Sequence, residues 1–272
     1  MDTKFFLGIG LAIVLVFCGA AVYTTFTKLP TASAVPADHE ILYQVSTIDA
    51  LMQGVYDGVQ PVGELRRHGN FGIGTFDALD GEMIVLDGKV YQAKADGRLY
   101  EVMDTATTPF ATVTYFERDI QETINRPMNF SVFSTEMSGR LPSQNMIYAV
   151  RMQGTFPIMK VRAIPAQQKP YPTLTDAAKN QSVYTYTNTT GTVVGFYTPV
   201  FFKGLNIAGY HLHFISNDRN TGGHILDFTV PANTTVEYDI TPAFAMPLPT
   251  SGDFTGVDLS QDLTKELAKV EQ

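Results

Sequence analysis

Three of the five histidines in this 272-residue chain fall within a fourteen-residue stretch, at His211, His213 and His224. Residues 208–215 are aromatic and apolar, which predicts a β-strand, and residues 216–223 are dense in turn-forming residues. Histidines at positions i and i+2 of a strand point to the same face, and an antiparallel return strand at 224–230 brings the third beside them. The pattern therefore predicts a β-hairpin that carries a three-histidine cluster.

Such a cluster favours a metal site. Three neutral imidazoles suit zinc and leave one coordination position open for water or substrate, as in catalytic zinc sites. A single histidine on a strand is more often a surface or core group, so the third histidine across the hairpin decides the interpretation. Iron, manganese and nickel sites also use histidines, and the residues alone leave the metal open.

Composition narrows the class of protein. The hydrophobic content of 44% and charged content of 17% fit a globular protein. The net charge of −8, without a basic run, argues against nucleic-acid binding, which needs a cationic surface. Cys18 is the one cysteine, so neither a disulfide framework nor a cysteine-rich zinc site is expected.

The N-terminal 38 residues predict a targeting segment. Residues 5–26 are almost wholly apolar, about the length of one membrane span, and a loose linker follows them. Ala32-Ser33-Ala34 has the form of a signal-peptidase site, so a cleaved signal peptide and an uncleaved membrane anchor both remain open. Either one predicts export, with the folded part periplasmic, secreted or anchored to the outer face of the membrane.

The rest of the chain predicts mostly β-structure. Residues 46–49 resemble a helix capping box, and apolar residues follow at helical spacing. Residues 82–91 predict a hairpin with Asp87-Gly88 as its turn, whereas residues 117–125 predict a short helix. A segment rich in proline and glutamine at residues 165–172 predicts a domain boundary.

The expected fold class is α+β and β-rich, with two subdomains of mixed or antiparallel sheet, a few helices and a zinc site on a β-hairpin of the C-terminal half. Residues 39–165 form the expected N-terminal domain, and residues 166–272 form the C-terminal domain with the histidines. A final amphipathic helix is predicted from apolar residues at helical spacing: Leu259, Leu263, Leu267 and Val270.

Several short motifs lie between about Gln44 and the C-terminus. They are Gly69–Phe76 (GNFGIGTF), Leu79–Glu82 (LDGE), Tyr148–Arg151 (YAVR), Met159–Ala163 (MKVRA), Gly195–Pro199 (GFYTP), Gly209–Phe214 (GYHLHF) and Gly222–His224 (GGH). Taken together, these motifs resemble the α-acetolactate decarboxylase family. The resemblance implies loss of CO2 from 2-hydroxy-2-methyl-3-oxobutanoate (2-acetolactate) to give acetoin. It also implies a homodimer formed through the N-terminal sheet.

The resemblance further implies a set of site residues. The zinc ligands would be His211, His213 and His224. Residues with catalytic or substrate-binding roles would be Glu82, Arg162, Thr75 and a C-terminal carboxylate, for which Glu271 is expected and Glu266 is the alternative. Judged without the family, Glu82 could be a solvated charge beside a hairpin, and Arg162 could be a surface cation next to Lys160.

The implied chemistry suits these residue types. A Lewis-acidic metal can take up the charge that decarboxylation of a β-keto acid leaves on oxygen. A guanidinium offers a planar fork for a carboxylate, and a carboxylic acid can deliver a proton. Two alternatives use the same histidines: an exported zinc hydrolase or cupin-like isomerase, and a non-enzymatic metal-binding domain.

Overall fold

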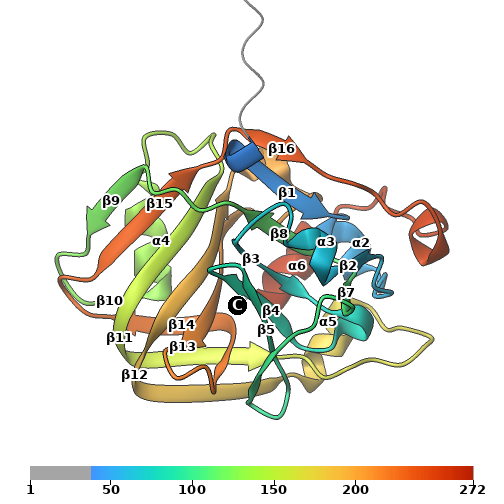
Figure 1. The fold of residues 1–272 in the computed structure, drawn as a ribbon, viewed down its shortest axis with the longest axis horizontal. Helices are drawn as coiled ribbons and strands as arrows, with labels where there is room; N and C mark the ends of the chain where they lie inside the picture. Colours follow the sequence, from blue (N-terminus) through green and yellow to red (C-terminus); the bar gives the residue numbers. More distant parts are fainter. Residues whose placement is uncertain (1–37, 272) are drawn as a thin grey trace, which may run out of the picture. The chain divides into compact units, whose positions relative to one another are not determined.

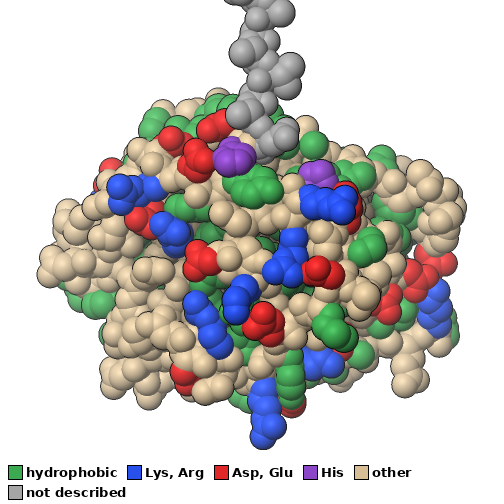
Figure 2. Space-filling model, in the orientation of Figure 1, with side chains coloured by type: hydrophobic (Ala, Val, Ile, Leu, Met, Phe, Trp, Pro, Cys, Tyr) green, Lys and Arg blue, Asp and Glu red, His purple; other side chains and the backbone are tan. Residues whose placement is uncertain are grey.

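The computed structural model describes residues 38–271, which form a β-rich fold with short helices (Figure 1). The predicted signal peptide or anchor at residues 5–26 lies outside this range. Among the helices of residues 38–271, none is long and apolar enough to cross a membrane. On the face drawn in Figure 2, basic and acidic side chains are interspersed, without a contiguous basic patch.

The first sheet has seven strands and is mixed, because β1 pairs parallel with β16 and antiparallel with β8. Its strands, in spatial order, are β16 (Ala243–Ala245), β1 (Ile41–Val45), β8 (Ala111–Thr114), β3 (Phe71–Thr75), β4 (Glu82–Leu86), β5 (Lys89–Ala93) and β6 (Leu99–Glu101).

The second sheet also has seven strands, and its two longest strands, β11 and β12, pair along most of their length. Its strands, in spatial order, are β10 (Met128–Asn129), β14 (Gly222–Val230), β13 (Gly209–Ser216), β12 (Ser182–Thr198), β11 (Tyr148–Ala163), β15 (Thr235–Ile240) and β9 (Ile120–Thr123). Because β11 also pairs with β14, strands β11 to β14 form a closed ring of paired strands.

The remaining elements are short. The α-helices are α2 (Ile48–Met52), α3 (Val62–Leu65), α4 (Phe130–Ser138), α5 (Leu174–Ala177) and α6 (Thr264–Val270). Single turns of 3₁₀-helix lie at Asp38–Glu40, Asp77–Leu79, Ala178–Asn180, Val200–Phe202 and Gly252–Thr255. A two-stranded pair joins β2 (Gln60–Pro61) to β7 (Thr107–Thr108).

The two sheets share a buried core. One apolar cluster combines Phe71, Ile73 and Ile84 of the first sheet with Phe196 and Ile215 of the second. Burial of apolar surface between two sheet faces is the main force that holds such layers together. The expectation of a β-rich fold with two sheets is thus confirmed, and strands β13 and β14 of the histidine hairpin contact strand β4 of the first sheet.

Several local predictions hold. The β4–β5 hairpin turns at Asp87 and Gly88, whose φ angles of 52° and 75° match the type I′ turn that Asp-Gly favours. Helix α2 begins within the predicted segment, although its N-cap is Thr47, one residue after Ser46, and the Thr47 side chain accepts a hydrogen bond from the Ala50 amide. It ends at Met52, earlier than the apolar spacing suggested.

Other predictions were wrong because strand pairing overrides local propensity. Residues 120–123 form strand β9 against β15 instead of a helix. Strand β11 continues through Pro157 without a break. The proline-containing segment after residue 164 links β11 to β12, so the boundary expected near residue 165 lies inside one sheet.

Candidate active site

The hairpin of β13 and β14 brings the three histidines together. His213 and His224 are register partners, and His211 lies two residues before His213 on the same strand face. All three side chains are buried, and each offers a ring nitrogen within 4.8 Å of the others. Gly223 lets β14 approach β11 closely at this point, because its φ is 150° and a Cβ would lie 2.5 Å from the Arg162 carbonyl oxygen.

The spacing of the ring nitrogens fits a tetrahedral metal. His211 Nε2 and His224 Nδ1 are 3.2 Å apart. Two nitrogen ligands at the usual zinc distance of about 2.05 Å, on a tetrahedral ion, would be separated by about 3.3 Å. The pair therefore already has the separation that a shared metal ion requires.

The third histidine is oriented by the first sheet. His213 Nδ1 lies 2.9 Å from the Met83 carbonyl oxygen, which can only accept, so Nδ1 carries the proton and donates. His213 Nε2 then carries a free lone pair, and this atom is buried without a hydrogen-bond partner among residues 38–271. A backbone carbonyl that fixes the tautomer in this way is typical of metal-binding histidines.

Burial keeps all three rings neutral. It lowers the pKa of His213 to about 3, although the hydrogen bond to Met83 opposes the shift. Burial also lowers the pKa of His211 and His224, and the positive charge of Arg162 adds to the effect. Neutral imidazoles with converging lone pairs can hold a divalent metal ion.

Arg162 lies beside the histidines and is only 4% exposed. It is the register partner of His224 across the β11–β14 pairing. Its Nη2 donates to Glu271 Oε1 at 3.3 Å and its Nη1 donates to Gln181 Oε1 at 3.4 Å, whereas Nε has no partner among the described residues. Lys160, two residues earlier, is exposed, so the surface alternative applies to Lys160 and not to Arg162.

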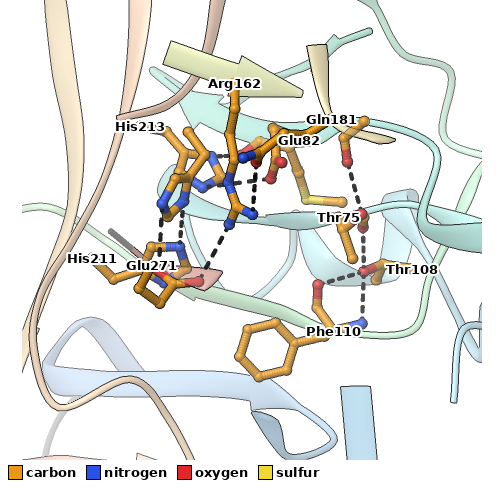
Figure 3. A network of polar contacts seen from close by, with 12 residues as sticks. Thr75, Glu82, Thr108, Phe110, Arg162, Gln181, His211, His213 and Glu271 are labelled. Atoms are coloured by element: carbon orange, nitrogen blue, oxygen red, sulfur yellow. Dashed lines mark hydrogen bonds and ion pairs between the residues drawn. The ribbon is translucent and has the colours of Figure 1, made fainter. Parts of the chain in front are cut away.

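Glu82 is likewise inside the site. It is 7% exposed, opens strand β4, and lies with Oε2 3.8 Å from His213 Nε2. Burial raises the pKa of Glu82 to about 7; Arg162 opposes this shift, Glu271 reinforces it, and the Ile164 amide opposes it. The alternative of a solvated charge beside a hairpin does not describe this residue (Figure 3).

Glu271 follows helix α6 and enters the same cavity. Its Oε2 lies 3.4 Å from His224 Nε2, and its side chain is 14% exposed. Burial raises its pKa, although Arg162 opposes the shift. Glu266 lies in the first turn of α6 and does not line the cavity, so the structure places Glu271 and not Glu266 at the histidines.

Thr75 completes the polar part of the cavity. Its side chain is buried, and its hydroxyl donates to the Gly81 carbonyl oxygen at 2.7 Å. Because its one proton is donated to Gly81, the Thr75 hydroxyl can only accept a hydrogen bond from a ligand. Thr75 and Glu82 are register partners on β3 and β4, and this pairing explains why two residues seven positions apart line one cavity.

The opposite wall of the cavity is apolar, and sequence patterns did not point to it. Its residues come from loops and short helices: Ile48, Leu51, Leu79, Phe110, Ile164, Leu174 and Ile207. Gln181, which accepts from Arg162, was also missed, since an isolated glutamine carries no sequence signal. The space between the two walls, including its opening, measures about 380 Å³.

Comparison with known proteins agrees with this geometry. The α-acetolactate decarboxylase family matches residues 42–261. The chain is 52% identical to an α-acetolactate decarboxylase of Methanosarcina mazei over 86% of this chain and 81% of that protein. It is 44% identical to one of Methylococcus capsulatus, over 86% and 89%.

A solved structure gives the same result. The crystal structure of α-acetolactate decarboxylase from Bacillus subtilis strain 168 superposes with a TM-score of 0.82 at 38% identity, covering 85% of this chain and 99% of that one. The match extends over both sheets and the histidine hairpin, because it covers most of residues 38–271. The chain therefore belongs to the α-acetolactate decarboxylase family.

Proposed function

We propose that the chain converts 2-acetolactate to acetoin and CO2 in this cavity, with a zinc ion held by His211, His213 and His224. The observation that carries the proposal is the convergence of three neutral, buried histidines beside a buried arginine that already pairs with a carboxylate. Family membership supports the substrate. The histidine set supports a divalent metal, and zinc is the ion that three histidines suit well.

A bound zinc ion would supply Lewis acidity toward the keto and hydroxyl oxygens of the substrate. Arg162 supplies the complementary contact. Its Nε is buried without a partner among the described residues, so it can donate to the substrate carboxylate beside Nη2. Gln181 and Glu271 hold the other edges of the guanidinium, which fixes the plane of the fork.

The reaction needs one proton. The bond between C2 and the carboxylate breaks, its electron pair stays on the substrate as an enediolate, and a proton then forms the C–H bond of acetoin. Glu82 can hold that proton, because burial raises its pKa to about 7 and leaves much of it protonated near neutral pH. Glu271, which accepts a hydrogen bond from Arg162, is a second carboxyl group whose pKa is also raised.

An assay of the purified, zinc-loaded protein with racemic 2-acetolactate tests the proposal. Acetoin and CO2 should appear in equal amounts. A zinc hydrolase or isomerase would leave acetolactate intact while acting on esters or sugars, and a metal-binding domain would bind zinc without turnover. Absence of CO2 release from a fully zinc-loaded sample would reject the proposed function.

Export and dimer formation are separate proposals. The apolar segment at residues 5–26 supports export, either with cleavage or as a membrane anchor. The family resemblance supports a homodimer. Fractionation of the native cells and light scattering of the purified protein test them. Recovery of the protein in the cytoplasmic fraction would count against export. A mass equal to that of one chain would count against the homodimer.

A further inference from the structure

The cavity has two chemically distinct walls. The polar wall consists of the histidines, Arg162, Glu82, Glu271 and Thr75, and the opposite wall presents only apolar side chains. The apolar residues belong to a single buried cluster that also contains Tyr56, Ala177 and Val270. A ligand whose polar groups all face one wall must therefore place its alkyl groups against the other.

The proposed substrate has this division. Its carboxylate, hydroxyl and keto oxygens match Arg162 and the histidine cluster, which leaves two alkyl groups, the methyl on C2 and the methyl of the acetyl group. These groups have no partner on the polar wall. Their contact with the apolar wall would decide how large a C2 substituent the cavity accepts.

Phe110 is a part of that wall whose backbone is held by hydrogen bonds. It is 2% exposed and contributes the one phenyl ring among the described cavity-lining residues. Its amide donates to Thr108 Oγ1 at 3.2 Å, and its carbonyl accepts from the same hydroxyl at 2.9 Å and from the Thr75 amide at 3.0 Å. Figure 3 shows the ring pointing from this network toward the side of the site that holds Glu271 and His211.

Leu51 forms a second, independent part of the wall. It is buried on helix α2 and lines the cavity, whereas its neighbour Met52 is buried in the same apolar cluster without lining the cavity. The two positions therefore differ in access to the ligand but share their packing environment.

We propose that Phe110, together with Leu51, sets the upper size of the C2 alkyl group, an inference that rests on the proposed decarboxylase function. The fixed backbone of Phe110 cannot retreat from a longer group, so the ring acts as a rigid stop. Shortening Phe110 to leucine removes roughly the volume of one methylene. Specificity changes of this size are worth about tenfold or more in kcat/KM.

The test compares racemic 2-acetolactate with its 2-ethyl homologue. Phe110→Leu and Leu51→Val should each raise the kcat/KM ratio of ethyl to methyl substrate by about tenfold. The matched control Met52→Val, which removes side-chain volume from the same cluster, should leave the ratio within twofold of the unmodified protein. A second measurement is the Kd of the unreactive diols made by reducing the keto group of each substrate, which should show the same change in preference.

The outcomes separate the two proposals. If the unmodified protein releases no CO2 from acetolactate, the decarboxylase function fails. If it does so, but both variants keep the original ethyl-to-methyl ratio in kcat/KM and in Kd, the size limit lies elsewhere and this inference is overturned. Melting temperatures of all variants show whether each has folded. If Phe110→Leu does not fold, Leu51→Val still tests the inference.

Discussion

Arg162 and Glu271 are 109 residues apart in the chain, and their side chains meet inside the cavity with Arg162 Nη2 3.3 Å from Glu271 Oε1. Both side chains are largely withdrawn from water, at 4% and 14% exposure. An ion pair in this setting is strongly coupled, because removing either partner leaves an uncompensated charge. The pair also ties the C-terminal helix to the histidine cluster.

Arg162→Lys should lower turnover strongly. A lysine keeps the positive charge but lacks the planar guanidinium, which can donate hydrogen bonds to Glu271, Gln181 and the substrate carboxylate at once. We expect a fall in kcat on the order of 10²–10³-fold, measured by steady-state kinetics, with zinc content unchanged. The exposed Lys160 provides the control, since Lys160→Arg should have wild-type kinetics. Wild-type turnover for Arg162→Lys would remove the guanidinium from the reaction.

Glu82→Gln keeps the shape of the side chain but removes its titratable proton. We expect full zinc binding, a fall in kcat of about 10²–10⁴-fold and an altered ratio of acetoin enantiomers by chiral gas chromatography. A variant with unchanged rate and enantiomer ratio would require a different proton donor, with Glu271 or a metal-bound water as the next candidates.

Deletion of residues 271 and 272 should lower activity without preventing folding. Val270 and Leu263 still pack helix α6 against the body of the protein, whereas the melting temperature should fall because Arg162 loses its buried carboxylate partner. Activity should fall on the order of 10²-fold because Arg162 and His224 lose their carboxylate partner. Glu266→Gln is the matched control and should be fully active; a fully active truncation together with an inactive Glu266→Gln would assign the role to Glu266.

Asp239 gives a pH prediction away from the site. Burial raises its pKa to about 7, the hydrogen bond from the Glu117 amide opposes this shift, and the nearby carboxylates of Asp119, Glu40 and Glu117 reinforce it. The folded state then binds more protons than the unfolded state between about pH 4 and pH 7, so this residue makes stability fall as pH rises through that window.

Asp239→Asn cannot ionise and should remove this effect. The gain in melting temperature over the unmodified protein should be larger at pH 8 than at pH 5, by on the order of 5 °C. Thermal unfolding followed by circular dichroism at both pH values measures it, with the exposed Asp87→Asn as control. Equal shifts at the two pH values would show that Asp239 is ionised in the folded protein throughout.

Much of the fold and site could be predicted from the sequence, because the signals are local. The His211-x-His213 spacing and the turn before His224 predict the hairpin directly. The Asp87-Gly88 turn predicts the β4–β5 hairpin for the same reason. In each case the residues that decide the structure lie within a few positions of one another.

The rest depends on contacts between distant segments. Residues 120–123 form a strand because they pair with β15, and no local sequence pattern indicates this pairing. The apolar wall combines residues as far apart as Ile48 and Ile207, each of which looks like an ordinary core residue in sequence. Helix α4 was also missed, since it is amphipathic only weakly and buries just Phe133 and Met137.

The most direct test of the account is activity as a function of bound zinc. Chelation should abolish decarboxylation of 2-acetolactate, and added zinc should restore it in proportion until one ion is bound per chain. His211→Ala, His213→Ala and His224→Ala should each lose zinc by elemental analysis and nearly all activity, whereas the exposed His39→Ala should keep both. Full decarboxylation by metal-free protein, or full zinc occupancy and activity in any of the three variants, would contradict the account.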